Sequence, residues 1–155
     1  MTETRGPRLS NEAIFDPDQH AGVQQMIKSI RAVGVPAQTL ELVHMRASQI
    51  NGCAACMEYG TQSAAKSGLS TERLVALAGW YESTRFSDPE RAALGLTDAM
   101  TRLADRPGAV TDEIWQQVVE HYDERASAAL VSMIALTNFF NRINTTLKVQ
   151  PGAWG

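Results

Sequence analysis

Helix start and stop signals recur along almost the whole chain, and signals for β-strands are nearly absent. Capping residues stand immediately before most of the segments with helical apolar periodicity, and glycine or proline follows several of these segments; the capping residues are Asp16, Ser70, Ser87 and Thr111. No run alternates apolar and polar residues, and no tight turn separates two β-branched stretches. The chain is therefore predicted to be all-α, a helical bundle of six to seven helices.

The domain organisation follows from length and from the absence of linkers. The chain has 155 residues, enough for one domain with a substantial core, and contains no internal repeat or low-complexity tract. We expect a single domain over residues 1–155, with residues 1–12 forming a poorly ordered N-terminal tail.

The last segment, residues 123–149, is apolar almost all the way round through its middle. Such a helix is buried in the core or between subunits, and in a small chain we expect one face of it to meet another protomer. Asn138, Asn141 and Arg142 are polar exceptions that must be hydrogen-bonded if buried. A buried arginine requires a carboxylate, and Glu90 is the candidate considered.

Charge and hydropathy exclude several classes of function. The net charge of −3 gives no electrostatic reason to expect nucleic acid or an anionic membrane as a partner. The N-terminus lacks the apolar stretch of a secretory signal, and no uninterrupted apolar run approaches the length of about 18 residues that spans a bilayer. We expect a cytoplasmic protein, in which cysteines more often serve catalysis or metal binding than structure.

The two cysteines, Cys53 and Cys56, form a C-x-x-C pair directly after an Asn51-Gly52 turn. Residues three apart on a helix share a face within disulfide reach, and a helix start stabilises a thiolate. The pair is therefore a candidate redox dithiol. Two alternatives remain open: inert buried cysteines, or a zinc site completed by histidines at no recognised spacing, which would come from His20, His44 and His121.

Glu41 lies twelve residues before Cys53, on the preceding predicted helix. If the turn folds the two helices into a hairpin, its carboxylate comes near the thiols. In an apolar cleft this carboxylate would have a raised pKa and could accept a thiol proton. The alternative is a solvated surface glutamate.

These residues resemble a known signature. The stretch "ELVHMRASQINGCAACMEYGTQSAAKSG" is similar to that of the alkylhydroperoxidase D-like (AhpD-like) proteins of the carboxymuconolactone decarboxylase superfamily. The segments "ERAALGLTDAMTRL" and "LTNFFNRINTTL" resemble later helices of that family, so the resemblance covers most of the chain from about residue 16.

The resemblance implies an all-helical protomer that assembles as a trimer or hexamer and reduces hydroperoxides without a cofactor or metal. A dithiol carrier such as a lipoyl-type protein would re-reduce it. By position, Cys56 would attack the peroxide, Cys53 would be the more accessible partner that meets the reductant, and Glu41 would relay protons.

The chain departs from the family motif at Gly60, where a histidine usually follows the second cysteine by four residues. Tyr59 and His44 are possible substitutes, each with packing or surface exposure as the alternative. The departure leaves three functions open: a thiol peroxidase with an antioxidant role, a redox-sensing or binding oligomer with little catalysis, and a decarboxylase-type enzyme. The C-x-x-C pair argues against the third, because that branch relies on histidine chemistry.

Overall fold

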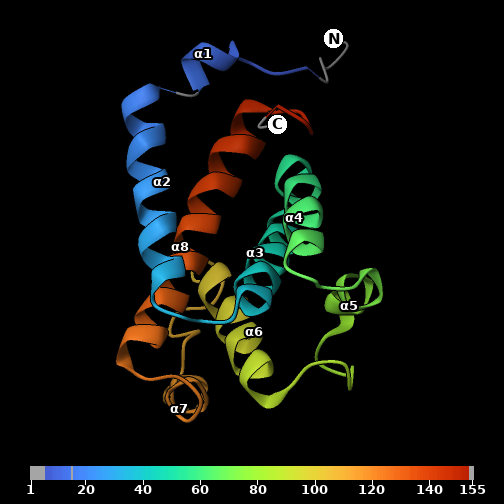
Figure 1. Cartoon of the computed structure of the whole chain (residues 1–155), viewed down its shortest axis with the longest axis vertical. Helices are drawn as coiled ribbons and strands as arrows, with labels where there is room; N and C mark the ends of the chain where they lie inside the picture. The colour runs from blue at the N-terminus through green and yellow to red at the C-terminus, as the bar shows by residue number, and fades with distance from the viewer. Residues whose placement is uncertain (1–5, 15, 154–155) are drawn as a thin grey trace.

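A computed structural model describes residues 6–14 and 16–153, and these residues form helices and connecting turns (Figure 1). The predicted all-α class is confirmed. The described residues contain eight α-helices and one short 3₁₀ helix: α1 (Asn11–Ile14), α2 (Pro17–Ala32), α3 (Ala37–Asn51), α4 (Ala54–Lys66), α5 (Thr71–Ala76), η1 (Leu77–Gly79), α6 (Asp88–Thr101), α7 (Asp112–Val119) and α8 (Glu124–Leu147).

The count exceeds the expected six to seven helices partly because α1, a helix of four residues, lies at the edge of the segment expected to be a tail. Arg8 also differs from that expectation. Its backbone N–H donates to the Leu147 carbonyl at 2.9 Å, and its guanidinium donates to the Thr146 carbonyl at 2.8 Å. Residues 1–5 lie outside the described residues.

The helices begin where their capping residues predict. Asp16 accepts hydrogen bonds from two backbone N–H groups at the start of α2. Ser87 and Glu90 form a reciprocal capping box at the start of α6, and Thr111 caps α7. The starts of these three helices are therefore determined by local side-chain chemistry.

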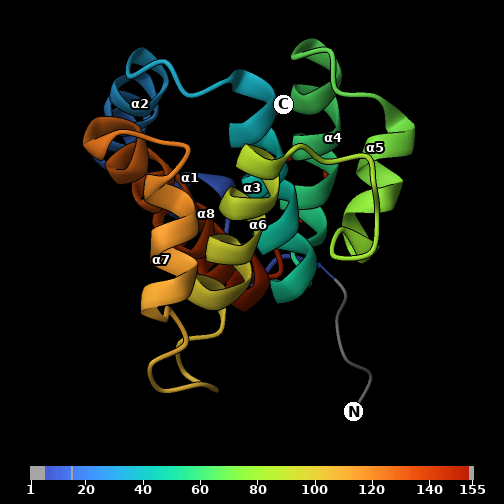
Figure 2. The same cartoon turned by 90° about the horizontal axis from the view of Figure 1, so that it is seen from below.

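Helix α3 lies at the centre of the bundle, in contact with α4, α6 and α8 (Figure 2). It contributes to two groups of buried apolar side chains on its different faces. Leu40 and Val43 pack with residues of α6, α7 and α8, whereas Leu42 and Met45 pack with residues of α4, η1 and α6. A helix that is buried on several sides provides a rigid support for a site.

Helix α8 has the length and composition of a membrane-spanning helix, with a mean hydropathy of 1.2 over its most apolar window. A core helix meets the same criterion, and α8 buries three asparagines in hydrogen bonds to other helices, Asn138, Asn141 and Asn144. We therefore interpret α8 as a core helix of the bundle.

The expected carboxylate partner of Arg142 is wrong. Arg142 donates to the backbone carbonyl and side-chain oxygen of Asn138 at 3.1 and 3.0 Å. Glu90 instead forms an ion pair with Arg73 at 2.7 Å. Arg142 is exposed, and its guanidinium donates within its own helix, so it does not need an anion from α6.

Candidate functional site

The turn between α3 and α4 positions the two cysteines. Gly52 closes α3 with φ of +66°, a left-handed conformation that glycine adopts without a Cβ penalty. Cys53 is the N-cap of α4, and its sulfur accepts the Cys56 backbone N–H at 3.3 Å. The two cysteines are joined in a disulfide with a Cα–Cα distance of 5.3 Å. The predicted placement of both cysteines in the first turn of a helix is therefore confirmed.

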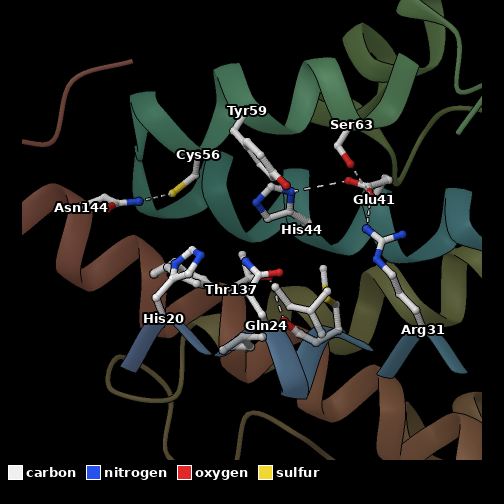
Figure 3. Close-up of a pocket in the computed structure, with 14 residues that line it drawn as sticks. His20, Gln24, Arg31, Glu41, His44, Cys56, Tyr59, Ser63, Thr137 and Asn144 are labelled. Carbon is white, nitrogen blue, oxygen red and sulfur yellow. Dashed lines mark hydrogen bonds and ion pairs between the residues drawn. The ribbon is translucent and has the colours of Figure 1, made fainter. Parts of the chain in front are cut away.

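Cys56 faces a cavity of about 160 Å³ between the α3–α4 pair and the facing helices α2 and α8 (Figure 3). One end of the cavity is polar and contains Glu41, His44 and Arg31, while the opposite wall is largely apolar. The apolar lining residues are Ile27, Met133, Leu136 and Phe140. An apolar pocket that converges on a few polar groups is the usual form of a small-molecule site.

Glu41 is buried, with 2% of its side chain exposed, so the alternative of a solvated glutamate is wrong. Arg31 and Ser63 donate to its Oε1 at 2.8 and 2.7 Å, and His44 Nδ1 lies 3.8 Å from its Oε2. Burial raises the pKa of Glu41, but the hydrogen bonds from His44, Ser63 and Arg31 outweigh burial and lower it. The expected raised pKa is therefore incorrect, because His44 on α3 itself, Ser63 of α4 and Arg31 of α2 all stabilise the charged carboxylate.

His44 fills the space next to Gly60. A Cβ atom added at position 60 would overlap the Met45 sulfur and lie 3.0 Å from both Cε1 and Nδ1 of the His44 ring. His44 and Cys56 line the same cavity. An imidazole from α3 therefore occupies the neighbourhood in which the family motif places one from α4.

Tyr59 also lines the cavity, although more than half of its surface is exposed. Its ring packs edge-on against His44 with centroids 6.2 Å apart. No hydrogen bond joins its hydroxyl to Cys56 in the part of the chain that the structure describes. The contact supports a packing role for Tyr59 beside His44.

Cys53 lies on the other side of the disulfide, under a second opening formed by the end of α8 and the residues after it, Lys148 to Pro151. The resemblance implies that Cys53 is the more accessible cysteine. In this structure both are buried, with exposures of 1% for Cys53 and 4% for Cys56. In the disulfide state, therefore, Cys53 is not the more exposed cysteine that the resemblance implied.

Two further residues line the cavity, and the sequence indicated no role for either of them in the chemistry of the dithiol. Asn144 of α8 donates from Nδ2 to the Cys56 sulfur at 3.2 Å, and His20 of α2 lies at the Cys56 end of the cavity (Figure 3). Asn144 is 88 positions from Cys56, so no local spacing could have indicated the contact. The only indication in the sequence was that Asn144 follows Asn141 by three residues, which places both on one face of the helix.

The alternative of a zinc site gains no support from the arrangement. The described residues contain no group of three or more histidine, cysteine, aspartate or glutamate side chains positioned to hold a metal ion. Both sulfurs are also engaged with each other in the disulfide.

The fold and site together define a class: an all-helical protein whose disulfide at a helix start faces a cavity with a buried carboxylate. Residues 17–99, just over half of the chain, match the carboxymuconolactone decarboxylase family, and the chain belongs to that family as an AhpD-like member.

Similar proteins support this assignment. The chain is 35% identical to the uncharacterized protein YdfG of Bacillus subtilis over 81% of its own length and 84% of YdfG. It is 31% identical to the uncharacterized protein YnjA of Escherichia coli over 70% of its length and 58% of YnjA.

Solved structures share the fold. ATU0492 from Agrobacterium tumefaciens, a protein of unknown function proposed to be the antioxidant defence protein AhpD, superposes with a TM-score of 0.85 at 27% identity, over 94% of this chain and 98% of that one. The debrominase Bmp8 superposes with a TM-score of 0.76 at 23% identity, over 89% of this chain and 74% of Bmp8. This second likeness concerns the fold alone.

Proposed function

We propose that the protein is a thiol peroxidase that reduces organic hydroperoxides and cycles through the Cys53–Cys56 disulfide. The observation that carries the proposal is the position of Cys56 at a helix start, facing a cavity that also contains Glu41 and His44. A helix start favours the thiolate, which is the nucleophile. The apolar wall of the cavity suits the carbon skeleton of an organic hydroperoxide.

The first half of the cycle oxidises the dithiol. The Cys56 thiolate attacks the terminal oxygen of R–O–O–H, so that an S–O bond forms, the O–O bond breaks and the alkoxide leaves with a proton. This gives R–OH and the Cys56 sulfenic acid. The Cys53 thiol then attacks the Cys56 sulfur, the disulfide forms and water leaves.

His44 is the group proposed to deliver the proton to the leaving alkoxide, with the Glu41 carboxylate stabilising the protonated imidazole. Fast peroxide reduction requires such a donor, because an unprotonated alkoxide is a poor leaving group. Arg31 and Ser63 keep the Glu41 carboxylate ionised, and His44 lies along the cavity between this carboxylate and Cys56 (Figure 3). His44 thereby supplies the function that the histidine of the motif would perform from position 60.

The second half of the cycle requires a reductant. A dithiol such as a lipoyl-type carrier would attack the disulfide, leave as its own cyclic disulfide and restore both thiols. The opening beside Cys53 is the proposed approach for this reductant. The reducing cytoplasm is the proposed compartment, and a trimer or hexamer built in part on α8 is the proposed assembly.

The test is consumption of cumene hydroperoxide by reduced protein, with dihydrolipoamide as the recycling reductant. Cys56→Ser removes the nucleophile and should abolish turnover, whereas Cys53→Ser should allow one round of oxidation without recycling. His44→Gln should slow the reaction by about 10²-fold, in line with the loss of a general acid. Wild-type protein that consumes no more peroxide than Cys56→Ser would rule out the proposed function.

A further inference from the structure

The Asn144 side chain contacts the reactive sulfur from α8. Only 3% of this residue is exposed, and its Nδ2 donates to the Cys56 sulfur at 3.2 Å. A disulfide sulfur carries no hydrogen and can only accept, so the amide must present its N–H side to Cys56. The carboxamide oxygen therefore points elsewhere.

That oxygen, Asn144 Oδ1, is buried and has no hydrogen-bond partner. The other buried asparagines of α8 are satisfied: Oδ1 of Asn138 and Oδ1 of Asn141 both accept from Asn51. Buried acceptors in folded proteins are almost always paired, and an exception needs an explanation. Asn144 lines both the cavity at Cys56 and the opening at Cys53, so its side chain lies beside both places where a ligand could meet a thiol.

We propose that the Asn144 carboxamide is the hydroperoxide-binding group of this site, with Nδ2–H holding the Cys56 thiolate and Oδ1 accepting the hydroxyl hydrogen of the substrate. This inference rests on the proposed peroxidase function and adds a residue to it. One planar group then orients the two atoms that must react, the sulfur and the terminal peroxide oxygen.

The same contacts persist through the next step. When the thiolate takes the terminal oxygen, that oxygen keeps its hydrogen and becomes the Cys56–S–O–H group, which still donates to Asn144 Oδ1. After the Cys53 thiol attacks and water leaves, the acceptor loses its donor. The unpaired Oδ1 of the disulfide state is the expected consequence of that departure.

The first readout needs no peroxide. In a Cys53→Ser background, where serine retains the N-cap, the pH dependence of Cys56 alkylation by iodoacetamide reports the thiol pKa. Asn144→Leu removes the donor and should raise this pKa, so that alkylation at pH 6 falls about tenfold. Asn141→Leu is the matched control, because this equally buried amide bonds Ser48 and Asn51 and contacts neither sulfur.

The second readout isolates the acceptor. At pH 9.5, where the thiolate predominates, Asn144→Leu should react with hydrogen peroxide about tenfold more slowly than its parent, with Asn141→Leu unchanged. Asn144→Asp keeps the shape and the acceptor but loses the donor, so it should also raise the thiol pKa. This variant replaces Asn144→Leu in the experiment if the leucine variant does not fold. Unchanged alkylation profiles in both Asn144 variants, or equal effects from Asn141→Leu, would overturn the inference.

The outcomes separate this inference from the peroxidase assignment. If wild-type protein does not react with peroxides but Asn144→Leu still raises the thiol pKa, the proposed function fails and the thiolate contact stands. If wild-type protein turns over and Asn144→Leu matches it at pH 9.5, the peroxidase stands and substrate binding by Asn144 is refuted.

Discussion

Replacing Gly60 with alanine tests whether the space beside the dithiol is as full as the structure indicates. Gly60 lies inside α4 with an ordinary helical conformation, because it is not among the glycines with positive φ. In an open helix, alanine at such a position is more stable than glycine by about 1 kcal/mol. Propensity alone therefore predicts that Gly60→Ala stabilises the protein.

Packing predicts the opposite sign. The new methyl group would overlap the Met45 sulfur and lie 3.0 Å from two atoms of the His44 ring. Met45 is flexible but buried, and overpacking a full core costs about 1–3 kcal/mol. After the propensity gain, the expected net loss is between zero and about 2 kcal/mol, and each kcal/mol lowers Tm by about 2–4 °C in a chain of this size.

Gly95→Ala is the matched control for this substitution. Gly95 lies inside α6, and a Cβ there would meet Trp80 at 3.9 Å, an ordinary van der Waals distance. It should stabilise the protein by about 0.5–1 kcal/mol. Both variants are compared by urea unfolding at one protein concentration with the disulfide intact. If Gly60→Ala gains as much stability as Gly95→Ala, the crowding argument is refuted.

Two further predictions concern ionised groups. Glu41→Gln should lose about 1–3 kcal/mol at pH 7, since a neutral amide bonds Arg31 and Ser63 less strongly. Because the folded pKa of Glu41 lies below its ordinary value of 4.5, its stabilisation is present above pH 4.5 and is lost as the pH falls through the folded pKa. Unfolding free energies of wild type and variant should therefore converge below pH 4.5, and parallel curves would contradict this. Asp98→Ala should cost about 2 kcal/mol, because it strips Arg46 of a two-point ion pair at 2.6 and 3.0 Å and removes a Trp80 hydrogen bond. Thermal unfolding checks this against the exposed Asp105→Ala, which should change stability by less than about 0.5 kcal/mol.

Features encoded within a few residues of each other could be predicted from the sequence. The capping residues, the left-handed Gly52 and the shared face of Cys53 and Cys56 all depend on local chemistry, and each is observed. The hairpin of α3 and α4 also places Glu41 and Cys56 along one cavity, although at different ends of it (Figure 3). Spacing and short-range sterics were sufficient in these cases.

Features that depend on distant segments could not be predicted. The pKa of Glu41 is lowered partly by Arg31, whose approach depends on how α2 packs. Arg73 takes Glu90 as its partner from seventeen residues away, which left the expected pairing with Arg142 wrong. The contact between Asn144 and Cys56 spans 88 positions and exists only because α8 packs against α4.

The amides at positions 138, 141 and 144 recur every three residues, so they follow one face of α8. Asn51, the last residue of α3, donates to the first two, and the third holds Cys56. The C-x-x-C hairpin is therefore held in place by hydrogen bonds to a helix almost ninety residues later in the chain. Grafting residues 41–63 onto another scaffold would transfer both thiols and Glu41 but not Asn144, the amide that contacts Cys56. A transplanted site would therefore need the hairpin, the C-terminal half of α8 with Asn144, and the part of α2 that carries Arg31.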